Sequence, residues 1–141
     1  MECITFRARY KYQLKETYTV RIGIRPPADI DTDYLALTTD GVLTVKKSYA
    51  WDGPSGPTID SLNFMRGSLV HDALYQLMRE RLLDEETYRD TADRLLQRIC
   101  IEDGMSSLRA WFVYQAVHYF GEPSADPAND KPVTKAPEGC G

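Results

Sequence analysis

YAWDGPSGPTIDSLNFMRGSLVHDALY, residues 49–75, contains the point at which the periodicity of this sequence changes. Before it, apolar and polar residues alternate, whereas after Pro57 apolar residues recur at steps of three and four. A period of two is typical of half-buried strands, and a period near 3.6 is typical of an amphipathic helix. The Gly/Pro-rich segment 49–60 is therefore the predicted junction between a β-rich part and a helical part.

Upstream of this junction the sequence predicts a small antiparallel sheet. Residues 4–24 alternate apolar or aromatic side chains with polar ones and are rich in Tyr, Thr, Val and Ile, which favour strands. Pro26-Pro27 ends this run. The next run contains Asp40-Gly41 between two β-rich segments, a dipeptide typical of tight hairpins.

Downstream, the sequence predicts three helices within residues 61–121. The first has apolar residues at helical spacing, although Gly67 weakens its start. Asp84 is placed to cap the second helix, which we expect to end near Gly104. The third covers SSLRAWFVYQAVHYF and ends before Gly121. We expect its aromatic stripe to be mostly core, and any face left exposed would be an oligomer or membrane-contact patch. The stripe comprises Trp111, Phe112, Tyr114, Val117, Tyr119 and Phe120.

These elements predict one α+β domain over residues 1–121, with a β-rich part (1–48), the Gly/Pro-rich segment (49–60) and three helices (61–121). A length of 141 residues suits a single domain. Residues 122–141 are rich in Pro, Gly, Ala and charge without periodicity, which predicts a disordered C-terminal tail.

Composition argues against several classes of protein. The net charge is −4 and the basic residues are scattered, which argues against a nucleic-acid partner. The three cysteines form no CxxC pair, so they indicate neither a disulfide framework nor a zinc knuckle and fit a reducing compartment. We expect no signal peptide and no transmembrane segment, because no apolar run has the required length and flanks.

A candidate catalytic cluster lies on the first two predicted helices. His71 and Asp72 are adjacent, so their side chains point about 100° apart around the helix. Tyr75 follows one turn later. If the second helix runs back antiparallel, both legs of the hairpin are roughly 16 Å long, and Asp93 returns to the level of His71. A carboxylate there would hold one imidazole nitrogen and select its tautomer.

Each of these features also has a structural interpretation. A His-Asp pair on a helix is usually half-exposed, and Asp93 could be the i+4 partner of Arg89. The Gly/Pro-rich segment could be an ordinary junction turn. His118, among aromatics on the third helix, is expected in the core or at its boundary and not as a ligand.

The order Tyr49, Gly53-Pro54, Pro57, Asp60, His71-Asp72, Tyr75 and Ala92-Asp93 resembles the secretory and viral phospholipase A2 families. The similarity covers residues 49–100 and is greatest to the parvoviral capsid domains and the small bacterial enzymes. It implies that His71 is a general base that activates water. It also implies that Asp93 orients His71 and that Tyr75 supports Asp93.

The same resemblance implies calcium as the cofactor. Asp72 would be its carboxylate ligand, the segment from Trp51 to Gly56, including Gly53, would supply carbonyl ligands, and Asp52 would be an extra ligand. Calcium takes six to eight oxygen ligands of this kind. A bound cation would polarise an ester carbonyl.

The chain also resembles an uncharacterised family of phage and prophage proteins with YAWDGPS, HDALY and a later AD. We therefore expect a phage protein of the host cytoplasm or the virion that hydrolyses a phospholipid or another ester. The alternatives are a non-catalytic structural or accessory protein that binds a phage protein partner or itself, and a hydrolase of peptide or cell-wall bonds. The sequence leaves open whether the protein is an enzyme.

Overall fold

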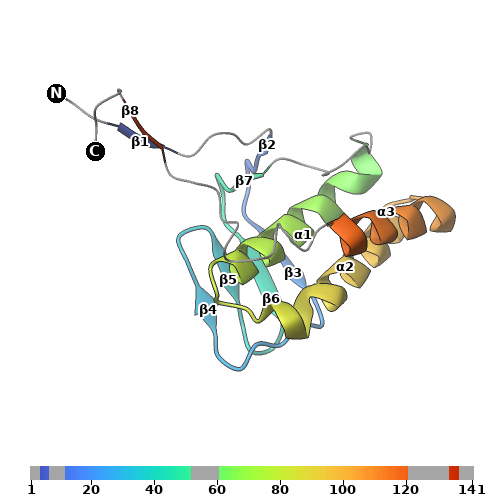
Figure 1. The fold of residues 1–141 in the computed structure, drawn as a ribbon, viewed down its shortest axis with the longest axis horizontal. Coiled ribbons are helices and arrows are strands. Elements are labelled where there is room, and N and C mark those ends of the chain that lie inside the picture. Colours follow the sequence, from blue (N-terminus) through green and yellow to red (C-terminus); the bar gives the residue numbers. More distant parts are fainter. Residues whose placement is uncertain (1–3, 7–11, 52–60, 121–133, 137–141) are drawn as a thin grey trace.

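Antiparallel strands occupy the N-terminal half of the protein and three helices follow, which confirms the predicted α+β class (Figure 1). The structure is a computed structural model and describes residues 4–6, 12–51, 61–120 and 134–136. The strands are β1 (Ile4–Phe6), β2 (Tyr12–Gln13), β3 (Tyr18–Arg21), β4 (Ile30–Asp31), β5 (Leu35–Leu37), β6 (Val42–Val45), β7 (Ala50–Trp51) and β8 (Thr134–Ala136). The helices are α1 (Leu62–Arg79), α2 (Glu85–Glu102) and α3 (Ser107–Phe120).

Four of the strands form an antiparallel sheet in the order β3-β6-β5-β4. Asp40-Gly41 lies in the turn between β5 and β6, as predicted, and Thr38 N–H donates to the Val42 carbonyl at 3.0 Å. Gly41 has a φ of +83°, a conformation that favours glycine. The junction is tied to the β-rich part by a separate pair, β2 with β7.

The predicted disordered tail, residues 122–141, includes one segment that the structure describes. Thr134–Ala136 forms β8, which pairs antiparallel with β1. The remainder of the predicted tail lies outside the described residues.

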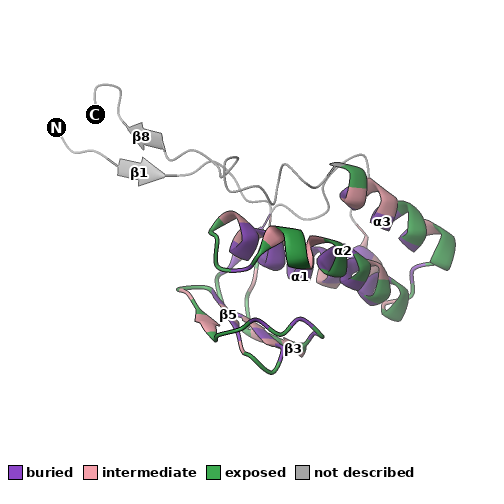
Figure 2. Ribbon diagram, turned by 60° about the horizontal axis from the view of Figure 1, so that its bottom comes forward, coloured by how far each residue is buried: buried purple, intermediate pink, exposed green. Residues whose placement is uncertain are grey.

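The main core lies between the sheet and the helical hairpin of α1 and α2, which cover one face of the sheet (Figure 2). The alternating pattern in β5 and β6 puts one set of side chains on this face, and all of them are fully buried: Leu35, Leu37, Leu43 and Val45. α1 is buried on most of its surface because the sheet, α2 and α3 surround it. The helix that carries His71 is therefore held rigidly from several sides.

The limits of α2 agree with the sequence prediction. The Asp84 side chain accepts a hydrogen bond from Thr87 N–H at 2.9 Å, which satisfies one unpaired donor of the first turn. The helix ends at Glu102, two residues before Gly104, whose φ of +100° is a left-handed conformation. The hairpin of α1 and α2 thus has defined ends, which sets the register of their facing residues.

The prediction for the aromatic stripe of α3 was wrong in part. Trp111, Phe112 and Tyr119 are 47%, 59% and 71% exposed, whereas Tyr114 and Val117 are buried. α3 packs on α1 and α2 through a narrow row that includes Ala110, Val113 and Val117. No other described element covers the opposite face of α3, so the aromatic residues there stay accessible. Within the described residues, no helix has the length and apolar character needed to cross a membrane.

Gly67 allows the close approach of α1 and α2. From the sequence, this glycine was interpreted only as a residue that weakens the start of the helix. A Cβ atom at position 67 would lie 2.8 Å from Leu96 Cδ1 and 3.1 Å from Cys100 Sγ. Leu96 and Cys100 are buried and have little room to move. The glycine is therefore a packing requirement of the hairpin that positions His71 against Asp93.

We expect Gly67→Ala to destabilise the protein, because overpacking costs roughly 1–3 kcal/mol and exceeds the helix-propensity gain of about 1 kcal/mol. Urea unfolding measures the difference. The second variant Leu96→Val removes part of the clash, so the double mutant should recover part of the loss beyond additivity. Equal stability of Gly67→Ala and the wild type would contradict this account of the helix contact.

Candidate functional site

A buried cluster of His71, Tyr75 and Asp93 lies between α1 and α2, and we call it the His-Tyr-Asp cluster. His71 Nε2 is 2.7 Å from Asp93 Oδ1, and the Tyr75 hydroxyl donates to the same oxygen at 2.5 Å. His71 is 5% exposed, Tyr75 2% and Asp93 0%. The antiparallel hairpin thus brings together the three residues that the sequence selected as base, orienting carboxylate and support.

The hydrogen bonds select one tautomer of His71. A carboxylate accepts hydrogen bonds and donates none, so Nε2 carries the proton that is shared with Asp93. Nδ1 of the neutral imidazole is then an acceptor, which is the form needed to take a proton from water. Burial and the hydrogen bond to Asp93 raise the pKa of Tyr75 well above its usual range, which keeps its hydroxyl protonated as a donor.

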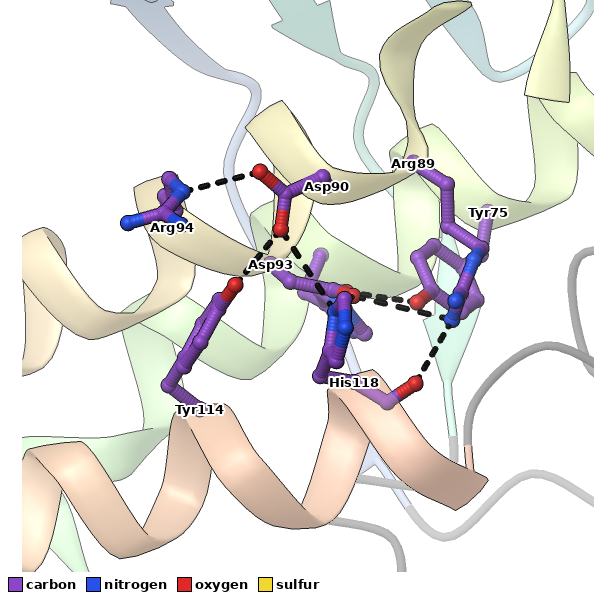
Figure 3. Close-up of polar contacts among 8 residues, drawn as sticks. Tyr75, Arg89, Asp90, Asp93, Arg94, Tyr114 and His118 are labelled. Atoms are coloured by element: carbon purple, nitrogen blue, oxygen red, sulfur yellow. Dashed lines mark hydrogen bonds and ion pairs between the residues drawn. The ribbon is translucent and has the colours of Figure 1, made fainter. Parts of the chain in front are cut away.

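The second oxygen of Asp93 faces two nitrogen groups at longer range (Figure 3). Arg89 Nη1 is 3.8 Å from Asp93 Oδ2, and His118 Nδ1 of α3 is 3.9 Å from it. Neither Asp93 Oδ2 nor His118 Nδ1 has a hydrogen-bond partner within the described part of the chain, although both atoms are buried. Arg89 also donates to the His118 carbonyl at 3.1 Å, so it links α3 to the site.

A second polar group, at the surface, adjoins the cluster. Tyr114 donates to Asp90 Oδ1 at 2.6 Å, and Arg94 donates to Asp90 Oδ2 at 2.8 Å (Figure 3). These two hydrogen bonds, that from Tyr114 first, lower the pKa of Asp90. His118 Nδ1 lies 3.5 Å from Asp90 Oδ1 and stacks on Tyr114 with ring centroids 5.4 Å apart. His118 therefore has carboxylates of α2 on its inner side.

The predicted metal ligands divide into two groups. Asp52, Gly53 and Gly56 lie outside the described residues. Asp72 is half-buried on α1, next to His71. Trp51 is a buried residue of β7 whose indole N–H donates to Ser68 Oγ at 3.2 Å, so its side chain anchors the junction to α1. Among the described residues, no group of three or more His, Cys, Asp or Glu is arranged to hold a metal ion.

Sequence interpretation did not assign four residues to the site: Arg89, Asp90, Tyr114 and His118. It had placed His118 at the core or its boundary, and the ring is at the boundary but faces the carboxylates of α2. The sequence also allowed an alternative in which Asp93 pairs with Arg89 and has no catalytic role. In the structure, the Asp93 carboxylate lies near both His71 and Arg89. The i, i+4 spacing of Tyr114 and His118 was a usable signal, since it puts both on one helix face.

The fold and the cluster define a class of protein: an α+β domain with a buried His-Tyr-Asp cluster inside a helical hairpin. Residues 29–117, more than half of the chain, match the family described as "Protein of unknown function (DUF1353)". The chain belongs to this DUF1353 family. No significant match was found among curated proteins or among solved structures.

Proposed function

We propose that this protein is a hydrolase of the phospholipase A2 type that cleaves a phospholipid or another carboxylic ester. The observation that carries the proposal is the buried contact of 2.7 Å between His71 Nε2 and Asp93 Oδ1, with Tyr75 on the same oxygen. A histidine held in this way has a defined tautomer and orientation, as a general base requires.

In the proposed reaction, His71 Nδ1 accepts a proton from a water molecule as the water attacks the ester carbonyl. Asp93 holds the ring through Nε2 and stabilises the positive charge that develops on the imidazole. Tyr75, protonated because of its raised pKa, fixes the Asp93 carboxylate by donating a hydrogen bond to the same oxygen, Oδ1. The proton on Nδ1 then passes to the leaving alcohol, which returns His71 to its starting form.

Calcium is part of this proposal, and the donor types present suit it. Asp72 supplies a carboxylate beside His71, and the Gly/Pro-rich segment 49–60 supplies backbone carbonyls, both of which calcium prefers. When bound, the ion would polarise the ester carbonyl and stabilise its oxyanion. In this proposal, segment 49–60 contributes carbonyl ligands in addition to the Asp72 carboxylate.

We expect the protein to bind calcium in calorimetric titration, and we expect Asp72→Asn to abolish binding or weaken it at least tenfold. Removing one of the carboxylate charges around a hard cation costs affinity directly. The matched control is Asp33→Asn, an exposed aspartate in the β-rich part that loses the same charge. No binding at millimolar calcium, or equal loss in both variants, would refute the calcium-dependent mechanism.

The second candidate function is a non-catalytic accessory protein, and the burial of the cluster favours it. Asp93 is fully buried and His71 nearly so, a pattern that also suits a hydrogen-bonded network whose role is to rigidify the hairpin. Under this alternative, the protein hydrolyses no ester at any calcium concentration. Purified protein incubated with mixed phospholipid vesicles, followed by measurement of released fatty acid, separates the two candidates.

We further propose that the protein originates from a phage or prophage and acts in the host cytoplasm or in the virion. The motifs YAWDGPS and HDALY support this origin by resemblance. Mass spectrometry of purified virions and of infected-cell extracts tests the location. Detection in neither fraction would count against it.

A further inference from the structure

The exposed large hydrophobic side chains of the described chain are concentrated on α3. We call five residues of this helix the α3 outer face: Leu108, Trp111, Phe112, Gln115 and Tyr119. Gln115 is half-buried, and the other four are exposed. At 100° per residue, all five lie within an arc of about 100°. This arc is opposite the buried row through which α3 packs on α1 and α2.

The spacing within the α3 outer face is that of a seam between two helices. Four of its residues are separated by steps of four, three and four: Leu108, Phe112, Gln115 and Tyr119. Alternating steps of three and four are the pattern by which paired helices interdigitate their side chains. Trp111 lies beside this seam and widens it. Another helix with the same pattern is therefore a fitting occupant of the face.

The polar groups of α3 favour a second copy of the chain over a lipid surface. Helices that lie on membranes combine an apolar face with several Lys and Arg residues, whereas Arg109 is the only Lys or Arg in α3. The net charge of −4 also opposes binding to anionic lipid. Gln115 carries both a donor and an acceptor, so the amides of two copies can satisfy each other. Hydrocarbon would leave this amide without a hydrogen bond.

The area of the α3 outer face is at the lower limit for a specific dimer. A fully buried aromatic side chain covers roughly 150–250 Å², so the exposed parts of this face amount to about 500 Å² per copy. Two copies would bury about 1,000 Å² together, which is the smallest area expected of a specific interface. We therefore expect weak association, with a Kd in the micromolar range.

We propose that the protein forms a two-fold symmetric dimer in which the α3 outer faces of two copies pack against each other. This inference does not depend on the proposed hydrolytic function. Tyr114 and His118, on the inner side of the same helix, contact Asp90 of α2. The dimer would therefore also brace the helix that borders the His-Tyr-Asp cluster.

Sedimentation equilibrium of the full chain over micromolar to millimolar concentrations tests the proposal. We expect the mass to rise from 16.1 kDa toward twice that value as the concentration increases. The thermal midpoint should rise with concentration as well, because association stabilises the folded state by mass action. A wild-type protein that stays monomeric over the whole range would overturn the dimer.

Phe112→Glu tests whether the α3 outer face forms the interface. Phe112 is 59% exposed, so the fold should tolerate the change, whereas a dimer would bury two like charges near each other. We expect the dimer Kd to rise at least tenfold. Leu108→Glu is the second variant for the case in which Phe112→Glu does not fold. The matched control is Tyr34→Glu, an exposed aromatic residue of the β-rich part that gains the same charge and should leave the Kd unchanged.

A mixture of two charged variants tests whether the face contacts its own copy. Phe112→Glu and Phe112→Arg should each be monomeric where the wild type is dimeric, because like charges meet in each homodimer. Mixed in equal amounts, they should associate, since the two charges are then opposite. A mixture that stays as monomeric as either variant alone would overturn the self-contact, as would equal weakening by Phe112→Glu and Tyr34→Glu.

The remaining outcomes identify a different occupant, and each of them overturns the dimer. A monomer that floats with phosphatidylcholine vesicles, and loses this binding in Phe112→Glu, would assign the face to a membrane surface. A monomer in which Phe112→Glu lowers the free energy of unfolding, while Tyr34→Glu does not, would assign the face to a segment of the same chain.

Discussion

His71→Gln is expected to lower ester hydrolysis by roughly 10²–10⁴-fold, the usual contribution of a positioned general base. Glutamine retains an N–H donor at a distance comparable to that of His71 Nε2, so the hydrogen bond to Asp93 can persist. What it removes is the basic Nδ1 atom. The loss should fall on kcat with little change in KM, because the base acts in the transition state and not in substrate binding.

The control for His71→Gln is its stability. His71 is 5% exposed, so any substitution disturbs packing, and activity must be compared at a temperature at which the variant is folded by circular dichroism. Activity within twofold of the wild type in a folded variant would rule out His71 as the base. His71→Ala is less informative, because it leaves a cavity and removes the donor to Asp93 together with the base.

Asp93→Ala is expected to lower the free energy of unfolding by about 3–5 kcal/mol, the usual cost of breaking a buried charged pair. The substitution removes the acceptor shared by His71 and Tyr75, and it leaves the guanidinium of Arg89 without the carboxylate 3.8 Å away. Buried donors without acceptors retain their full desolvation cost. Denaturant unfolding monitored by circular dichroism measures the effect.

Asp90→Ala is the matched control for Asp93→Ala, since Asp90 is on the same helix but its side chain is 50% exposed. We expect a cost of at most about 1 kcal/mol there, because exposed ion pairs contribute little. Asp93→Asn should lie between the two alanine variants, since its amide oxygen can still accept from Tyr75. Equal costs for Asp93→Ala and Asp90→Ala would contradict the view that Asp93 organises the hairpin.

The central contact of the site was predictable from helix geometry. Equal legs of the hairpin on either side of Leu82 to Asp84 place His71 and Asp93 at one level, and the i+4 position of Tyr75 adds the second donor. The contacts to the other oxygen of Asp93 were not predictable in this way. They depend on how α3 crosses α2, and the nearly all-round apolar sequence of α3 does not specify which face turns inward.

The exposed aromatic residues of α3 are a second feature that the sequence alone could not predict. Hydrophobicity predicts that Trp111, Phe112 and Tyr119 tend to be buried, but burial requires a neighbouring element to cover them. In the described structure, α3 is an outer helix, so only its row facing α1 and α2 is covered. The number of layers around a helix is a property of the whole chain and cannot be obtained from one segment.

Local patterns in the sequence were sufficient for the α+β class, the Asp40-Gly41 hairpin, the ends of α2 and the meeting of His71 with Asp93. Each of these depends on interactions between residues near in sequence, or on one short connection whose length sets the register. The tight contact at Gly67 and the link from Arg89 to α3 required the packed structure. Their physical basis is steric and electrostatic contact between elements distant in sequence, which periodicity and spacing do not encode.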